Sequence, residues 1–215
     1  MLKSLTVGVL ASLAIVGCGK DTPAGRAGDE LDKQATEAQL RGGDWYAACD
    51  STNLIAAVVG INSSREVLDF DGTAERRFQY FSDAACTNLI GTSVYTGTAD
   101  VGPATTKDSN ARIIDMNFMN VTISFADQAT VDSINGNPLL PGCGINDFKV
   151  NEPRDVTANA GGLNCPYVSK PAPRYDILKT DGRTLNLGLN ENGLDGSTQE
   201  KRPLVIDPTV RFEKK

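Results

Sequence analysis

Hydrophobic residues alternate with polar ones over short stretches that are separated by turn residues. The clearest alternation is Leu-Asn-Leu-Gly-Leu at 185–189, which follows an Asp-Gly pair at 181–182. A second Asp-Gly pair, at 71–72, separates the apolar stretches 67–70 and 77–81. Alternation with a period of two predicts strands with one buried and one wet face, and an Asp-Gly pair between two such stretches is typical of a hairpin. We therefore predict two antiparallel β-hairpins.

The longest apolar stretch in the body of the chain, 113–125, changes phase in its middle. The apolar residues occupy even positions from Ile114 to Phe118 and odd positions from Met119 to Phe125. A β-bulge at this point would place both sets on one face and bend the strand, as barrels and strongly coiled sheets require. The alternative is a strand that is apolar on both faces, and the sequence alone does not decide between them.

One short helix is expected next, over 127–135, with Asp127 as its N-cap and Asn135-Gly136 as its end. The following residues, 137–173, are rich in proline and glycine, which indicates a long loop region. Many short strands, turn pairs and one helix predict a mostly β, antiparallel fold. We expect a β-barrel or a strongly curved sheet, with one short helix and a loop region held by disulfides.

The N-terminus has the parts of an export signal: a cation at Lys3, an apolar stretch over 5–16 and then small residues. The apolar stretch is shorter than the ~20 residues that a transmembrane helix needs, which favours a removable signal peptide over 1–17.

The end of this signal, Ile15-Val16-Gly17-Cys18, resembles the bacterial lipobox. That resemblance implies that Cys18 receives a diacylglycerol and becomes the first residue of the mature lipoprotein. An ordinary secretory signal with an incidental Cys18 is the alternative. Gly19 stands where lipoproteins kept at the inner membrane often carry Asp, so the resemblance implies an anchor in the outer membrane.

Residues 18–42 carry almost no large apolar side chains and are rich in charge, alanine and glycine. Such a composition predicts a lipidated, flexible tether, in which a short helix over 30–40 would be marginal alone. Residues 43–215 have the length of one domain with a core. The net charge of -6 argues against nucleic acid as a partner and against a second, electrostatic attachment to anionic lipid.

Lipidation of Cys18 would leave four of the five cysteines, an even set that an exported protein uses for disulfides. Three pairings are possible, and we favour the one in which each bond closes a moderate loop within one part of the chain. Zinc is the rival, but the chain has no C-x-x-C pair and no histidine. The favoured pairs are Cys49–Cys86 and Cys143–Cys165.

Catalytic and metal-binding chemistry has little support in the sequence. Without histidine the commonest general base is absent, and the scattered carboxylates are expected to lie on the solvated surface. The segment 190–196 is rich in oxygen ligands and glycine but lacks the spacing of an EF-hand loop, so we interpret it as a hairpin loop. We therefore expect that the protein is not an enzyme and that it binds neither a cofactor nor a metal ion.

Gly43-Asp44-Trp45 resembles the G-x-W motif of lipocalins, whose Trp packs across the closed end of the barrel under an Arg of the last strand. That resemblance implies that Trp45 and Arg211 close one end of a barrel.

A longer pattern resembles the adenomatosis polyposis coli down-regulated 1 domain and its bacterial lipoprotein relatives, and covers most of 43–215. The resemblance implies a barrel-like fold held by cysteines, with an apolar ligand cavity. One departure is Phe148, where a Trp is often expected. The pattern consists of 43–45 with Cys49, 80–86, 131–144 with Asp147, 155–157 with Cys165, 175–177, and Arg202-Pro203.

Taken together, these features predict a membrane-anchored, non-enzymatic envelope protein that binds an apolar small molecule such as a lipid or fatty acid. Small barrels fill their interior with side chains whereas larger ones hold a ligand, and the sequence does not give the strand number that decides this. The alternative is an envelope structural or protein-interaction module with a filled core. The residues expected to face the ligand are Met116, Phe118, Val121 and Ile123.

Overall fold

The alternating stretches form strands in the computed structural model, which describes residues 23–52, 60–136, 142–165 and 168–215. The strands follow the order β4-β3-β2-β1-β9-β8-β7-β5, all neighbours are antiparallel, and β5 pairs back with β4. The elements are α1 (Pro23–Leu40), β1 (Trp45–Ala47), β2 (Ser63–Asp69), β3 (Ala74–Phe81), β4 (Leu89–Ala104), β5 (Arg112–Phe125), α2 (Gln128–Gly136), β6 (Arg154–Asp155), β7 (Pro173–Thr180), β8 (Thr184–Gly188), the 3₁₀ helix η1 (Gln199–Lys201) and β9 (Ile206–Lys214).

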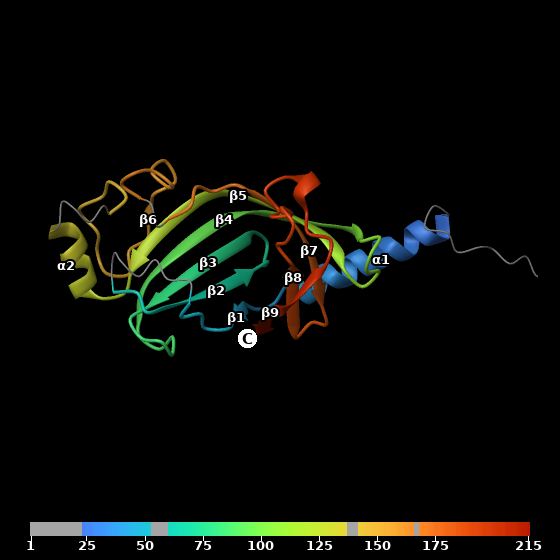
Figure 1. The fold of residues 1–215 in the computed structure, drawn as a ribbon, viewed down its shortest axis with the longest axis horizontal. Helices are drawn as coiled ribbons and strands as arrows, with labels where there is room; N and C mark the ends of the chain where they lie inside the picture. Colours follow the sequence, from blue (N-terminus) through green and yellow to red (C-terminus); the bar gives the residue numbers. More distant parts are fainter. Residues whose placement is uncertain (1–22, 53–59, 137–141, 166–167) are drawn as a thin grey trace, which may run out of the picture.

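These pairings close an eight-stranded antiparallel β-barrel, which matches the lipocalin-like barrel expected from the sequence. The short strand β6 is an addition that pairs with the second half of β5. Helix α1 lies at one end of the barrel and helix α2 at the other (Figure 1).

Both predicted hairpins are confirmed. The Asp-Gly pair at 71–72 connects β2 to β3, and the pair at 181–182 connects β7 to β8. Leu185 and Leu187 are buried while Asn186 between them is partly exposed, as the alternation requires.

Of the two alternatives for the phase change in β5, the structure has the β-bulge. Gly97 of β4 pairs with Phe118, whereas the preceding Thr96 pairs with Asn120, so that Met119 is the extra residue. Met119 is 53% exposed. The apolar residues before and after it therefore lie on the same buried face of β5.

The expectation of a flexible tether over 18–42 is wrong from Pro23 to Leu40, which form the 18-residue helix α1. The helix is fixed to the barrel by a few specific contacts rather than by a broad apolar face. Leu40 is buried in the core. Arg112, only 5% exposed, donates to the carbonyl and the carboxylate of Asp29 at 2.9 and 3.0 Å. Tertiary contacts thus stabilise a helix that would be marginal alone.

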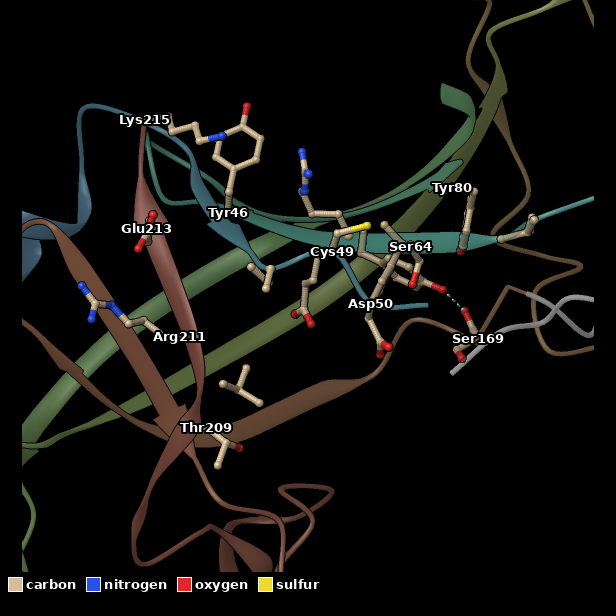
Figure 2. A pocket seen from close by; sticks show the side chains of 18 residues that line it. Tyr46, Cys49, Asp50, Ser64, Tyr80, Ser169, Thr209, Arg211, Glu213 and Lys215 are labelled. Atoms are coloured by element: carbon tan, nitrogen blue, oxygen red, sulfur yellow. Dashed lines mark hydrogen bonds between the residues drawn. The ribbon is translucent and has the colours of Figure 1, made fainter. Parts of the chain in front are cut away.

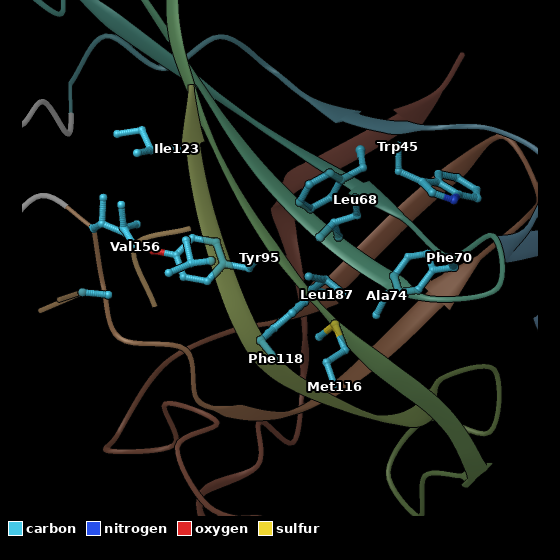
Figure 3. Close-up of a cluster of buried hydrophobic side chains, with 14 of the residues drawn as sticks. Trp45, Leu68, Phe70, Ala74, Tyr95, Met116, Phe118, Ile123, Val156 and Leu187 are labelled. Carbon is cyan, nitrogen blue, oxygen red and sulfur yellow. The ribbon is translucent and has the colours of Figure 1, made fainter. Parts of the chain in front are cut away.

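Part of the barrel core lies at the end where α1 packs. Trp45 is fully buried there, and Leu68, Phe70 and Ala74 lie around it (Figure 3). Farther along the barrel, buried residues of β5 continue the core, and one of them, Phe118, contacts the ring of Tyr95.

Helix α2 begins as the sequence predicts, because the carboxylate of Asp127 accepts a hydrogen bond from the backbone N–H of Thr130 at 2.8 Å. Both favoured disulfides are present. The Cys49–Cys86 bond joins the chain after β1 to the β3–β4 turn, and the Cys143–Cys165 bond holds the loop region that follows α2.

Candidate ligand-binding pocket

The barrel opens between β1 and β9 because β1 is short. The two strands pair only where Trp45–Ala47 face Phe212–Lys214. Beyond this point Asp50 pairs with Ser64 of β2, while β9 continues beside β8. A pocket of about 890 Å³, which we call the β1–β9 pocket, lies between the diverging segments (Figure 2). It is lined by Tyr46, Ala47, Ala48, Cys49, Asp50, Ile61, Ser64, Arg65, Glu66, Phe78, Tyr80, Tyr95, Ser169, Thr209, Val210, Arg211, Glu213 and Lys215.

Aromatic rings form one wall of this pocket. Phe78 of β3 and Tyr95 of β4 meet edge to face, with ring centres 5.9 Å apart. The ring of Tyr95 in turn meets Phe118 of β5 at 6.4 Å. The wall of the pocket is therefore continuous with the barrel core, and it offers apolar surface to a ligand.

Two phenol groups add polar atoms without charge. The hydroxyl of Tyr95 donates to the carbonyl of Ser169 at 3.1 Å, and the hydroxyl of Tyr80 lies 3.0 Å from that of Ser93. Burial, with a smaller contribution from Tyr80, raises the pKa of Tyr95 to about 12. Burial also raises the pKa of Tyr80. Both rings therefore stay neutral across the physiological range of pH.

An ion pair lies at the inner side of the pocket. Arg76 of β3 donates through Nε to Oε1 of Glu66 at 2.7 Å, and its guanidinium lies 4.6 Å from the ring centre of Phe78. Burial disfavours the charged form of Glu66, but the positive charges of Arg76 and, to a lesser extent, Arg174 outweigh burial and lower the pKa of this carboxyl. Glu66 is thus an ionised carboxylate inside the barrel.

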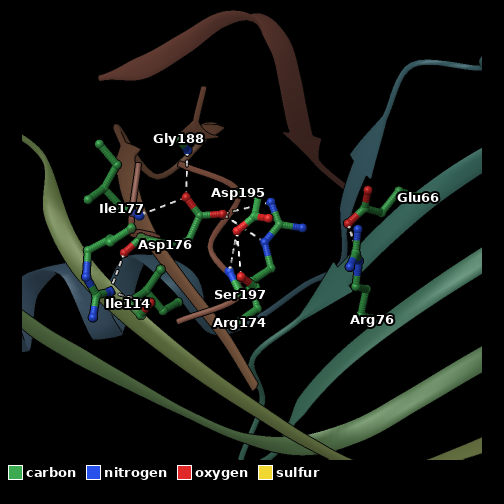
Figure 4. Close-up of polar contacts among 10 residues, drawn as sticks. Glu66, Arg76, Ile114, Arg174, Asp176, Ile177, Gly188, Asp195 and Ser197 are labelled. Carbon is green, nitrogen blue, oxygen red and sulfur yellow. Dashed lines mark hydrogen bonds and ion pairs between the residues drawn. The ribbon is translucent and has the colours of Figure 1, made fainter. Parts of the chain in front are cut away.

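A second ion pair, Arg174 with Asp176 of β7, is part of the same interior (Figure 4). Both Nε and Nη2 of Arg174 donate to Oδ2 of Asp176, at 2.9 and 2.7 Å. The other oxygen of Asp176 accepts from the backbone N–H groups of Ile177 and Gly188. Since every oxygen of this buried carboxylate is hydrogen-bonded, the pair is a satisfied structural element.

Charges of both signs surround the mouth of the pocket. Arg65, Arg211 and Lys215 are the cations, and Asp50 and Glu213 are the acids. Lys215 lies over the ring of Tyr46, with its ammonium 4.9 Å from the ring centre. Arg211 is exposed and forms no ion pair within the part of the chain that the structure describes. The rim is accordingly wet and carries little net charge.

The four β5 residues predicted to contact a ligand are buried in the core. Met116, Phe118, Val121 and Ile123 face the barrel interior and are at most 6% exposed. None of them lines the β1–β9 pocket. The pocket is lined instead by residues of β1, β2, β3, β4 and β9 and of the segments next to them.

The prediction that Trp45 and Arg211 together close one end of the barrel is wrong for Arg211. Trp45 is buried at the closed end, and its Nε1–H donates to the carbonyl of Leu40 at 2.9 Å. The cation over its ring is Lys214, whose ammonium lies 5.2 Å from the ring centre. Register explains the difference: Trp45 faces Lys214 across the sheet, so that even-numbered residues of β9 point inward and Arg211 points outward.

Cys49, which is bonded to Cys86, lines the pocket. Neither cysteine of the second disulfide is among the lining residues. Cys18, predicted to carry the lipid, lies outside the described residues. In the described segments, no cluster of histidine, cysteine, aspartate or glutamate has the makings of a metal site, and no helix has the length and apolar character needed to cross a membrane.

Sequence reasoning missed the interior charges, although strand phase carried a signal for one of them. Arg76 shares the inward phase of Phe78 and Tyr80, so its side chain had to enter the barrel. Glu66 faces Phe78 across the β2–β3 pair and therefore follows the same face. The proximity of Arg174, almost a hundred residues later, has no comparable signal in the sequence.

Comparison of the chain with models of known protein families found no match, and neither did comparison with curated proteins. The fold and the pocket therefore define the class of protein: a closed, eight-stranded antiparallel barrel with two disulfides and a pocket that opens through its side.

Proposed function

We propose that the protein is a non-enzymatic lipoprotein of the bacterial envelope that binds an apolar small molecule, such as a lipid or fatty acid, in the β1–β9 pocket. The observation that carries this proposal is the pocket itself, about 890 Å³ in the side of a closed barrel. Ligand sites of small molecules are usually concave, largely preformed and of about 300–1,000 Å³.

The lining of the pocket supports an apolar ligand. Phe78, Tyr80 and Tyr95 offer ring surface, and Ile61 and Val210 add aliphatic surface. Polar and charged residues make up much of the remaining lining, and such groups are suited to fix the orientation of a ligand. Since the chain also contains no histidine, binding is a better account of the pocket than catalysis.

The anchor is supported by the cysteines. Four of the five cysteines are in disulfides, which persist in oxidising compartments outside the cytoplasm. The remaining one, Cys18, ends the lipobox-like sequence, and Gly19 after it favours the outer membrane. The barrel and both disulfides agree with what the resemblance to the adenomatosis polyposis coli down-regulated 1 domain implies, and we propose that relationship as well.

Native mass spectrometry of the full chain, released from envelope membranes, tests the binding function. We expect additional mass from a co-purifying apolar molecule. The variant Ser64→Phe, which fills the pocket, should lose this mass, whereas Ser82→Phe on the exposed β3–β4 turn should keep it. A ligand-free wild type that also fails to bind a fluorescent fatty acid would rule the function out.

Metabolic labelling with radioactive palmitate tests the anchor separately. Label should enter the wild-type chain and be absent from Cys18→Ala. Label in both proteins, or in neither, would contradict lipidation of Cys18.

A further inference from the structure

Next to the inner side of the β1–β9 pocket, two arginines of the barrel interior have more hydrogen-bond donors than the protein uses. A guanidinium group has five N–H donors. Arg76 uses its Nε–H for Glu66, and its two terminal nitrogens donate to no atom of the described residues. Arg174 binds Asp176 through Nε and Nη2, which leaves Nη1 without a partner in the same segments.

These charged groups are reached by solvent from inside the barrel. Arg76 faces the barrel interior, because its cross-strand partners Leu68 and Tyr95 are both buried there. Its side chain is nevertheless 25% exposed, and that of Glu66 is 20% exposed. Glu66 lines the pocket. Arg76 is not itself a lining residue, but it is bonded to Glu66 and its guanidinium lies over the ring of Phe78, and both of these residues line the pocket. The ion pair therefore borders the space that a ligand would occupy.

Acceptors are scarce at the same place. Both oxygens of Asp176 are fully engaged, and Oε1 of Glu66 accepts from Arg76. Among these carboxylate oxygens, Oε2 of Glu66 alone has no hydrogen-bond donor in the described residues. The terminal nitrogens of Arg76 and Nη1 of Arg174 are donors that have no acceptor there. A group rich in acceptor oxygens would satisfy these donors, and guanidinium groups bind carboxylate and phosphate by paired hydrogen bonds.

We propose that the ligand is a single-chain amphiphile with an anionic carboxylate or phosphate head, which Arg76 binds at the inner side of the pocket while the chain lies against Phe78, Tyr80 and Tyr95. This inference rests on the proposed binding function. Arg174 contributes positive charge from β7. At the mouth, the three cations Arg65, Arg211 and Lys215 face the two acids Asp50 and Glu213, which leaves one net positive charge toward an approaching anionic head.

Isothermal titration calorimetry tests the head group, with the full chain in phosphatidylcholine nanodiscs and empty nanodiscs as the blank. The ligands are decanoate, decyl phosphate, decanol, decylamine and inorganic phosphate. We expect decanoate or decyl phosphate to bind at least tenfold more tightly than decanol and decylamine, and the better of the two identifies the head. Inorganic phosphate should bind far more weakly than either amphiphile.

Two results would overturn the inference alone, and a third would overturn the binding function as well. Decanol or decylamine binding as tightly as decanoate and decyl phosphate would show that the head is not recognised as an anion. Inorganic phosphate binding as tightly as decyl phosphate would show a free-anion site. If no decyl compound binds, the proposed function fails together with this inference.

Variants locate the head group. Arg76→Met should weaken binding of the preferred anion at least tenfold and change decanol binding less than twofold, while Arg183→Met on the exposed β7–β8 turn should change neither. If Arg76→Met fails to fold because Glu66 loses its partner, the neutral pair Glu66→Gln with Arg76→Gln should show the same selective loss. Unchanged anion affinity in a folded variant would exclude Arg76 as the binding group.

Discussion

The indole of Trp45 is held from two directions at the closed end of the barrel. Its N–H donates to Leu40 at the end of α1, and the ammonium of Lys214 lies over its ring. Lys214 also donates to the carbonyl of Gln39 at 2.9 Å. A cation over an aromatic face contributes about 0.5–1 kcal/mol when exposed and about 2 kcal/mol when desolvated. One side chain thus connects β9, Trp45 and α1.

Replacement of Lys214 should therefore destabilise the protein, whereas replacement of Arg211 should not. We expect Lys214→Met to lower the free energy of unfolding by about 1 kcal/mol, measured by urea denaturation. Arg211→Met should change it by less than about 0.5 kcal/mol, as is usual for an exposed residue. An effect of Arg211→Met as large as that of Lys214→Met would contradict the assignment.

Tyr95 should make stability fall at alkaline pH. Its pKa is about 12 in the folded protein against an ordinary value of 10.0. Between these values the unfolded chain releases this proton and the folded chain keeps it, so the free energy of unfolding decreases as pH rises, by up to about 1.4 kcal/mol per pH unit. Urea denaturation at pH 9.5 and 11.5 should show a smaller decrease for Tyr95→Phe than for wild type. Equal decreases would mean that Tyr95 titrates alike in both states.

At the scale of elements, local pattern predicted structure well where one strand could be judged by itself. The Asp-Gly hairpins, the phase change in β5 and the N-cap of α2 all depend on neighbouring residues, and all are confirmed. Helix α1 was missed beyond a marginal stretch because its stability comes from Arg112 and Lys214, which lie 83 and 175 residues along the chain from Asp29 and Gln39.

The bulge in β5 requires a glycine opposite it. A Cβ atom at Gly97 would lie 1.9 Å from the carbonyl oxygen of Asn117, a backbone atom that cannot move freely. Gly97→Ala should therefore cost about 2 kcal/mol or more of unfolding free energy, as judged by thermal and urea denaturation. Gly28→Ala is the matched control, because α1 has open space there, and it should add about 0.5–1 kcal/mol. A neutral Gly97→Ala would exclude this close approach.

At the scale of the whole molecule, the sequence predicted the barrel and its disulfides but not the position of the pocket. The pocket exists because β1 pairs with β9 over only three residues, and the two strands are the first and the last of the barrel. The short pairing of β1 with β9 decides which interior residues line the pocket and which fill the core. That is why Met116 and its neighbours in β5 were assigned to the ligand, whereas Glu66 and Arg76 were not.

The two disulfides should differ in their effect on binding. By loop entropy, Cys49→Ala with Cys86→Ala should cost about 4 kcal/mol of unfolding free energy, and Cys143→Ala with Cys165→Ala about 3 kcal/mol. Only the first pair has a member in the pocket lining. At a temperature where both double variants are folded, the first should bind a fluorescent fatty acid more weakly than wild type and the second should bind it equally. Equal loss in both would indicate that the disulfides act only through global stability.

Helix α1 sets a geometric relation between the barrel and any anchor that precedes it. Its 18 residues span about 27 Å, and Arg112 holds it near its beginning, at Asp29. If Cys18 is acylated as we propose, the five residues from there to Pro23 reach at most about 18 Å. Each residue inserted into the helix before Asp29 would then shift the anchor by about 1.5 Å and rotate its attachment by about 100° around the helix axis. The position of α1 would thus set the point from which the chain reaches from the barrel to the bilayer.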